Sequence, residues 1–229
     1  MKTVIITGAS GNLGTAVVDK FLLKGYQVIA TVSNESAINS ISHNDNLDIS
    51  AVNLANESET SEFVERIIQK YHLIDAALLL AGGFASGALE KTSGTDLMKQ
   101  YSLNFETGYY VAKPLFNHMM KQGRGKIIFV GSRSAIKASE GKSNIAYALS
   151  KSLLFNLTEL MNATAKGKNV TATIIVPSTI DTPANRKSMP NAEFNNWVKP
   201  QQIADVMEMI CSETGDSLRE TVLKIYGNA

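Results

Sequence analysis

Cysteine, net charge and long apolar runs are all scarce in this sequence of 229 residues. Cys211 is the only cysteine, which excludes an internal disulfide and fits a reducing compartment. The 22 Lys and Arg residues nearly balance the 21 Asp and Glu residues. A net charge of +1 therefore gives no electrostatic reason to expect a nucleic acid or an anionic membrane as a partner. The longest uncharged apolar run near the middle, residues 76–81, is too short to span a bilayer.

Signal segments, linkers and metal-ligand clusters are missing from the sequence as well. The first residues lead directly into a predicted strand, with no secretory signal or cleavage site, and this predicts a cytoplasmic protein. No low-complexity linker divides the chain, so we expect one domain over residues 1–229, and a hydrophobic content of 44% suits a sizeable core. His43, His72 and His118 are scattered without ligand spacing, so we expect no metal site.

The most informative stretch is TVIITGASGNLG at residues 3–14. Its β-branched first half predicts a buried strand, and a helical apolar pattern follows Gly8, Gly11 and Gly14, which are spaced by three. Such a turn is the usual entry to a nucleotide site, because bare backbone can approach a pyrophosphate and the helix N-terminus offers free N–H groups. A tight turn without a ligand is the alternative. No lysine precedes Thr15, so a dinucleotide is favoured over a mononucleotide.

The rest of the chain alternates between short apolar runs and amphipathic stretches. The further predicted strands are residues 26–32, 47–53, 73–80, 126–130, 169–176 and 221–226. The predicted helices are residues 12–24, 58–71, 96–121, 145–165 and 201–211, the third with a kink near 104–108 because it contains Pro114. This alternation predicts an α/β fold with a doubly wound parallel sheet of the Rossmann type, in three αβα layers.

The end of the second predicted strand bears on the choice of cofactor. A dinucleotide fold usually has an acid here that binds the ribose hydroxyls, but residues 32–34 are Val, Ser and Asn. The absence of a carboxylate favours NADP(H), because nothing repels its 2′-phosphate. No Lys or Arg is present to attract that phosphate, and Glu35 is close enough in sequence to reach the ribose, so NAD(H) stays open. Two later strand ends, 53–54 (Asn-Leu) and 81–83 (Ala-Gly-Gly), are further places where backbone can lie against a ligand.

Polar residues that could carry chemistry follow the strand at 126–130. Ser132 stands directly after that strand, and Tyr147 and Lys151 are four residues apart in a predicted helix. At this spacing the two side chains share a helix face. A neighbouring ammonium is expected to lower the pKa of the phenol and to make Tyr147 a usable general acid. The alternative is that the pair is ordinary helix surface.

These motifs together resemble the short-chain dehydrogenase/reductase family over essentially the whole chain. The matching features, in order, are TGxxGxxG, Asn104 in a long helix, Ser132, Tyr147-x-x-x-Lys151 and Pro177-x-x-x-x-Thr182. The resemblance implies a nicotinamide cofactor and hydride transfer to or from the carbonyl carbon of a small ketone or aldehyde, or the corresponding alcohol. It also implies pairing through the helices that carry Asn104 and Tyr147, hence a homodimer or homotetramer.

The resemblance assigns the catalytic roles to Asn104, Ser132, Tyr147 and Lys151. Tyr147 would protonate the carbonyl oxygen, Lys151 would hold the nicotinamide ribose, Ser132 would orient the substrate and Asn104 would anchor a water. Ser134 competes with Ser132, because Ser134 has the family's usual distance to the tyrosine. The implied cofactor-binding residues, strand ends included, are Gly8, Ser10, Gly11, Asn12, Leu13, Gly14, Ser33, Asn53, Leu54, Ala81, Gly82, Gly83, Tyr147, Lys151, Pro177, Ile180 and Thr182.

The segment 178–200 is predicted to be a substrate lid, and it is similar to the corresponding loop of dihydropteridine reductase. Arg186 and Lys187 would meet an anionic substrate or the cofactor phosphate, unless they form a solvated face. Phe194 and Trp197 would cover a planar ring, unless Trp197 packs against the last helix. Reduction of a pterin is therefore an alternative function, although the serine and the asparagine favour an ordinary ketone or aldehyde.

Two further alternatives stay open. A protein that binds NAD(P) as a sensor, without turnover, would keep the same fold. Leu153, Leu157 and Leu160 follow the Tyr/Lys pair at helical spacing and belong either to a subunit interface or to the core.

Overall fold

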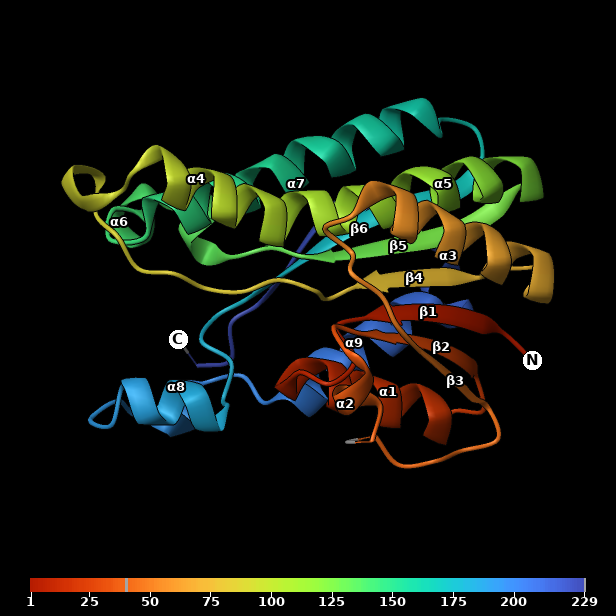
Figure 1. The fold of residues 1–229 in the computed structure, drawn as a ribbon, viewed down its shortest axis with the longest axis horizontal. Coiled ribbons are helices and arrows are strands. Elements are labelled where there is room, and N and C mark those ends of the chain that lie inside the picture. Colours follow the sequence, from red (N-terminus) through yellow and green to blue (C-terminus); the bar gives the residue numbers. More distant parts are fainter. Residues whose placement is uncertain (40, 229) are drawn as a thin grey trace.

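A single parallel sheet forms the centre of the molecule. A computed structural model describes residues 1–39 and 41–228. In this described part seven strands pair in the order β3-β2-β1-β4-β5-β6-β7, all parallel (Figure 1). The strands are β1 (Thr3–Thr7), β2 (Gln27–Val32), β3 (Leu47–Ala51), β4 (Ala76–Leu79), β5 (Arg124–Val130), β6 (Asn169–Pro177) and β7 (Val222–Ile225). The order reverses between β1 and β4, and ligands of such sheets bind at this reversal, beyond the carboxyl ends of the strands.

Helices connect the strands and cover both faces of the sheet (Figure 1). They are α1 (Asn12–Leu23), α2 (Glu35–Ile38), α3 (Glu57–Tyr71), α4 (Gly94–Tyr101), α5 (Thr107–Gln122), α6 (Ala138–Gly141), α7 (Ile145–Thr164), α8 (Pro183–Ser188) and α9 (Pro200–Cys211). On one face α1 and α9 pack on the sheet, and on the other face α3, α5 and α7 do so. The predicted three-layer, doubly wound Rossmann-type fold is confirmed.

The alternation of side chains along the strands builds the two cores. In β1 the five residues are all buried. Ile5 packs into the core under α3, α5 and α7, while Val4 and Ile6 pack into the core under α1 and α9. A strand covered on both faces needs apolar side chains at every position, which explains the uninterrupted β-branched run. None of the helices that the structure describes is both long and apolar enough to cross a membrane.

The helix predicted over residues 96–121 differs from the expectation. It begins at Gly94, because Ser93 caps it and Asp96 completes a capping box. A π-helical turn over Ser102–Glu106 then separates α4 from α5, so the irregularity overlaps the range predicted for the kink, near 104–108, and takes the form of a π turn. Such turns widen the helix locally and occur often at functional sites.

Candidate active site

The glycine turn between β1 and α1 forms a sterically constrained cradle. Gly8 has φ +67°, and a Cβ there would lie 3.1 Å from the Ala81 backbone. A Cβ on Gly14 would overlap the carbonyl oxygen of Gly8. The Thr7 hydroxyl accepts hydrogen bonds from the N–H groups of Leu80 (2.9 Å) and Ala81 (3.2 Å), which ties the end of β1 to the end of β4. The predicted glycine turn is confirmed, and at Gly8 and Gly14 the backbone leaves no room for a side chain.

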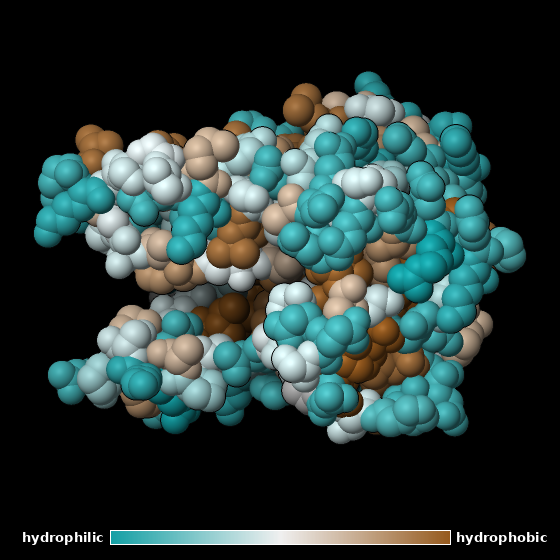
Figure 2. Space-filling view, viewed as in Figure 1, coloured by the Kyte–Doolittle hydropathy of each residue, from teal (hydrophilic) through white to brown (hydrophobic). Residues whose placement is uncertain are grey.

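A cavity of about 710 Å³ opens from this turn toward α8. Figure 2 shows the groove between the part of the molecule that carries α4 and α6 and the part that carries α8. The predicted cofactor residues that line the cavity are Gly8, Ser10, Gly11, Asn12, Leu13, Gly14, Ser33, Asn53, Leu54, Ala81, Gly82, Gly83 and Thr182. The residues that the prediction missed are Thr31, Val32, Val52, Ala55, Leu80, Phe84, Leu103, Thr107, Ala184 and Asn185. An elongated groove that starts on free helix N–H groups and bare glycine backbone fits a dinucleotide.

Four predicted cofactor residues, Tyr147, Lys151, Pro177 and Ile180, are not among the residues that line this cavity. Pro177 ends β6 and is buried, and the Ile180 carbonyl accepts a hydrogen bond of 2.8 Å from the Asn185 amide. Tyr147 and Lys151 lie against the loop of residues 81–84, at Phe84 and Gly82 respectively. The structure thus brings the predicted glycines and Thr182 together around one cavity and leaves these four residues out of its lining.

Asn104 fixes the loop that follows β4. Its side chain is 1% exposed and lies in the π-helical turn. Its Oδ1 accepts the N–H of Gly83 at 3.0 Å, and its Nδ2 donates to the Gly83 carbonyl at 3.0 Å and to the Ser150 hydroxyl at 3.2 Å. A Cβ on Gly82 would lie 2.6 Å from Asn104 Oδ1. In this state the amide holds protein groups on both sides, so Asn104 acts first as a clamp on the glycine loop.

Lys151 presents a buried ammonium to the same loop. The residue is 6% exposed, and Nζ donates a hydrogen bond of 2.8 Å to the Val130 carbonyl. A Cβ on Gly82 would lie 3.3 Å from Nζ, so only the bare glycine backbone separates the amine from the cavity that Gly82 lines. Burial lowers the pKa of Lys151 to about 8, because the charged form loses its hydration.

The Tyr147 phenol is paired with Ser132. The Ser132 hydroxyl bonds to the phenol and lowers its pKa, but burial has the larger effect and the pKa of Tyr147 is raised overall. The expectation that Lys151 lowers this pKa is therefore wrong for the protein alone, because the ammonium donates to the Val130 carbonyl.

Ser134, the alternative serine, is turned away from the phenol. Its hydroxyl donates toward the Glu140 carbonyl at 3.4 Å, and its N–H donates to Ser132 Oγ at 3.2 Å. Ser132 follows β5 and caps the turn of residues 133–135, and its side chain bonds to the Tyr147 phenol. Of the two serines, the geometry favours Ser132.

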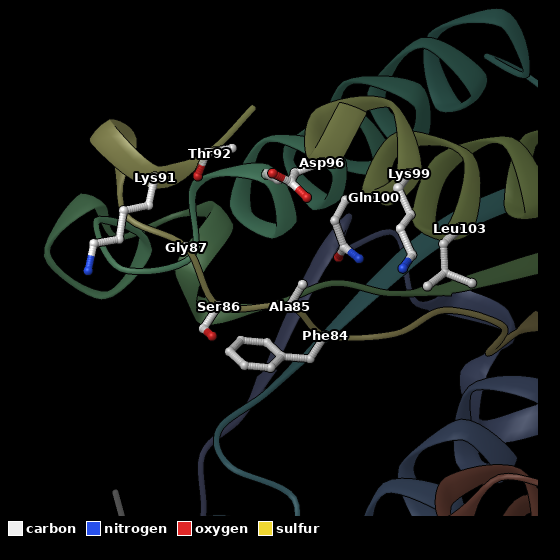
Figure 3. A pocket seen from close by; sticks show the side chains of 11 residues that line it. Phe84, Ala85, Ser86, Gly87, Lys91, Thr92, Asp96, Lys99, Gln100 and Leu103 are labelled. Carbon is white, nitrogen blue, oxygen red and sulfur yellow. The ribbon is translucent and has the colours of Figure 1, made fainter. Parts of the chain in front are cut away.

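Phe84 is a residue of the site that the sequence interpretation missed. It is 67% exposed, and its ring meets the Tyr147 ring edge-on, with centroids 5.1 Å apart and planes at 71°. It also lines a second cavity of about 340 Å³ (Figure 3), which shares Phe84 and Leu103 with the larger one. The available signal was its position immediately after the glycines of 81–83.

The segment 178–200, predicted to be a lid, carries the short helix α8, and the start of this helix lines the larger cavity. Thr182 caps this helix by accepting the Asn185 N–H at 3.2 Å, and both residues line the larger cavity. Arg186, expected to meet an anion, instead makes two hydrogen bonds to the Asp181 carboxylate, of 2.6 and 2.8 Å, and lies over the Phe194 ring. The ion pair raises the pKa of Arg186.

Trp197 does not cover a ligand. It is 9% exposed and packs against Phe194, with ring centroids 4.8 Å apart, and it is not among the residues that line the cavity. This burial supports packing rather than ligand contact for the tryptophan, with Phe194 as its aromatic partner. Phe194 in turn supports the Arg186 side chain rather than a bound ring.

The adenosine end of the cavity is uncharged. None of the described lining residues is an Asp, Glu, Lys or Arg. Ser33 is exposed, and Asn34 caps α2 by accepting the Ala37 N–H at 3.0 Å. The geometry therefore adds neither a repelling carboxylate nor an attracting cation to the choice between the two cofactors. Over residues 1–39 and 41–228, no group of three or more His, Cys, Asp or Glu side chains is placed to hold a metal ion.

Comparison with known proteins places the chain in a family. The family profile described as short chain dehydrogenase matches residues 2–193. The chain is 26% identical over 238 residues to 3-oxoacyl-[acyl-carrier-protein] reductase of Buchnera aphidicola, covering 99% of this chain and 96% of that protein. It is 28% identical over 213 residues to dihydropteridine reductase of Dictyostelium discoideum, covering 89% and 85%.

The solved structures show the same fold. A short chain dehydrogenase from Bacillus anthracis superposes with a TM-score of 0.87 at 19% identity, over 99% of this chain and 95% of that one. The sequence motifs and the profile match extend over most of the chain. The chain therefore belongs to the short chain dehydrogenase family and is an NAD(P)-dependent oxidoreductase of that family.

Proposed function

We propose that this protein reduces a small ketone or aldehyde, or oxidises the corresponding alcohol, with Tyr147 as the general acid or base. The observation that carries the proposal is the arrangement of three side chains: Ser132 bonds to the Tyr147 phenol, and the Lys151 ammonium reaches the bare backbone of Gly82. A nicotinamide cofactor, when bound, supplies or accepts the hydride. The protein's own task is to hold the carbonyl and to move one proton.

The residues divide that task as follows. The Tyr147 phenol, protonated because its pKa is raised, donates its proton to the carbonyl oxygen in the direction of reduction. The Ser132 hydroxyl orients that oxygen. Lys151 would hold the nicotinamide ribose across Gly82, because a Cβ on Gly82 would lie 3.3 Å from its buried ammonium. Asn104 positions this backbone through its hydrogen bonds to Gly83 and acts through it rather than on the substrate.

The cofactor lies along the glycine turn in this proposal, with a slight preference for NADP(H) over NAD(H). The pyrophosphate would rest on the N–H groups at the start of α1, next to Ser10, Gly11 and Asn12. The carboxamide end would meet Thr182 and the backbone of 177–180. The preference for NADP(H) rests on the missing carboxylate after β2, and the residues of 178–200 act as a substrate lid over the other end.

The similarity to a 3-oxoacyl reductase favours a 3-oxo compound among the ketones. Reduction of a pterin is the second candidate, which the similarity to dihydropteridine reductase and the lid support. Against it stand Ser132 and Asn104, which suit a simple carbonyl substrate. A sensor without turnover would have no need of the complete Ser, Tyr, Lys and Asn set.

We propose a cytoplasmic homodimer or homotetramer that uses the outer face of α4 and α7. Leu153 is 37% exposed and Leu160 is 66% exposed, whereas Leu157 packs against the core. Two exposed leucines together with Leu97 and Met98 of α4 make this face apolar. Sedimentation of the purified protein tests this part, and a clean monomer would overturn it.

The experiment that tests the function combines binding and turnover. A thermal-shift comparison of NADPH and NADH is expected to show stabilisation by at least one of them, because a ligand that binds only the folded state raises its stability. Oxidation of the better cofactor is then followed with a panel of ketones, aldehydes and a quinonoid dihydropterin. Turnover of a ketone or aldehyde supports the proposal, turnover of the pterin alone supports the second candidate, and binding without any turnover supports the sensor.

A further inference from the structure

The second cavity, of about 340 Å³, has a chemical character of its own. It lies beside the proposed reaction centre, since Phe84, Ala146 and Leu103 are shared with, or adjacent to, the residues that hold Tyr147 and the larger cavity (Figure 3). Its volume is in the range of small-ligand sites. A substrate whose carbonyl meets the Tyr147 phenol would extend past the Phe84 ring into this space.

Two lysines give this cavity a positive charge. Lys91 and Lys99 line it, and Asp96 is the one acid among the described residues that do. The Asp96 carboxylate is already held by the N–H (2.9 Å) and the hydroxyl (2.7 Å) of Ser93. In the described part of the chain, no hydrogen bond or ion pair joins either lysine to another side chain, although the charge of Lys99 is the last of the causes that lower the pKa of Asp96. The lining therefore carries an excess of one positive charge with ammonium groups available to a ligand.

The buried amide of Gln100 adds a polar group to the same cavity. Gln100 is 3% exposed, and its Oε1 accepts a hydrogen bond of 3.0 Å from Asn104. Figure 3 shows the Gln100 and Lys99 side chains extending together from α4 toward the segment that carries Phe84. The Gln100 amide is thereby fixed by the clamp residue of the glycine loop, and a polar donor group is held beside the lysine at the cavity wall.

We propose that the substrate carries a second, anionic group, a carboxylate or a phosphate, which this cavity binds through Lys99 with help from Lys91. This inference rests on the proposed reductase function. The lining of the larger cavity is uncharged, whereas the lining of the smaller cavity is cationic. An anionic group on the substrate is therefore attracted to the smaller cavity, next to Tyr147. The sequence predicted anion binding at Arg186 and Lys187. Arg186 is instead paired with Asp181, and neither residue lines either cavity, whereas Lys99 lines the smaller one.

The test compares matched carbonyl compounds on the protein loaded with its cofactor. The probes are acetoacetate against its ethyl ester, and dihydroxyacetone phosphate against dihydroxyacetone, so that carboxylate and phosphate are distinguished. The variants are Lys99→Gln and Lys91→Gln, and the control is Lys121→Gln, an exposed lysine at the far end of α5. We expect the wild type to prefer one anionic member about tenfold in kcat/KM, as one charge-assisted hydrogen bond provides.

The lysine variants test whether Lys99 and Lys91 bind the anionic group. Lys99→Gln is expected to lower kcat/KM for the anionic probe about tenfold, mainly through KM, and to leave the neutral probe within about twofold. Lys91→Gln is expected to act in the same direction with a smaller effect, and Lys121→Gln not at all. Equal kcat/KM values for anionic and neutral probes, or equal losses on both in Lys99→Gln, would overturn the proposal.

A binding measurement separates this proposal from the reductase function. Thermal shift of the cofactor-loaded protein is recorded with each anionic probe, in the wild type and in Lys99→Gln. Stabilisation of the wild type alone supports the anion site, even if no probe is reduced and the reductase proposal fails. Turnover of neutral carbonyls without any lysine-dependent anion effect overturns the anion site and leaves the reductase proposal in place.

Discussion

The two sides of the groove are built by different kinds of constraint. On the glycine side, Gly8 and Gly14 are fixed by backbone geometry, because any side chain there meets another part of the main chain. On the lid side, Thr182, Asp181 and Arg186 are fixed by exposed polar contacts between side chains or with a helix start. The glycine side of the groove therefore tolerates little substitution, whereas single substitutions on the lid side are expected to change its side-chain contacts without disturbing the backbone.

The largest expected effect falls where the two sides meet, at the phenol. Tyr147→Phe is expected to lower kcat by roughly 10²–10⁴, because a positioned general acid contributes about that much. Steady-state kinetics on the best carbonyl substrate measure the loss. Tyr109→Phe, on a tyrosine that stacks with Phe105 along α5, is the matched control and is expected to keep full activity. Full activity of Tyr147→Phe would show that another group supplies the proton.

The second prediction concerns the glycine side. Gly14→Ala is expected to lower the free energy of unfolding by about 2–3 kcal/mol, because the added methyl group overlaps the Gly8 carbonyl and forces the turn to shift. Chemical denaturation measures this change. Gly94→Ala in the first turn of α4, where a Cβ meets nothing within 4 Å, is the control and is expected to be neutral or slightly stabilising. Equal losses in the free energy of unfolding for the two substitutions would contradict the claim that the glycine turn is sterically constrained.

The third prediction uses the titration of Lys151. Burial lowers its pKa from 10.5 to about 8 in the folded protein, so the unfolded chain binds more protons between these values. The stabilising effect of the neutral amine is therefore complete above pH 10.5 and lost as the pH falls through about 8. The unfolding free energy of the wild type should rise with pH relative to Lys151→Met, by about 1–3 kcal/mol across this window. Parallel pH profiles of the two proteins would rule out a buried, titrating ammonium.

The smallest expected effect belongs to the lid. Arg186→Gln removes the pair with Asp181, which is exposed and screened by solvent, so little change in stability is expected. KM for the cofactor should instead rise by about two- to fivefold, because the start of α8 contributes to the cavity wall. Lys187→Gln, one residue further along the same helix, serves as the control. An equal rise in KM for the cofactor in both variants would mean that cofactor binding depends on the positive charge of α8 and not on the Arg186–Asp181 ion pair.

Much of the glycine side could be predicted from the sequence, because backbone constraints leave a direct mark on residue choice. Gly8 and Gly14 have no room for a side chain in the tight strand-to-helix turn, and the strand at 3–7 is buried at every position. The doubly wound parallel sheet and its layers follow from the alternation of strands and helices. An irregularity near 104–108 was expected because of Pro114, but no residue pattern indicates that it takes the form of a π-helical turn over 102–106.

Side-chain pairing was harder to predict, because it depends on what the fold brings close. Arg186 has an acid five residues before it, yet nothing in the sequence indicates that Asp181 rather than a ligand would bind it. The pKa of Tyr147 depends on burial, which outweighs the neighbouring hydroxyl. Phe84 and Lys99 became site residues only when the loop after β4 and the helix α4 enclosed one cavity.

In the proposed reductase, Tyr147 and Lys151 face a bound nicotinamide across the glycine loop of residues 81–83. A crystal structure of the complex with NADPH tests it most directly. The account predicts the nicotinamide ring between Gly82 and Thr182, with the Lys151 ammonium within hydrogen-bond distance, about 3 Å, of the ribose and the Tyr147 phenol beside the ring. A nicotinamide that lies on the far side of the groove, out of reach of both side chains, would contradict it.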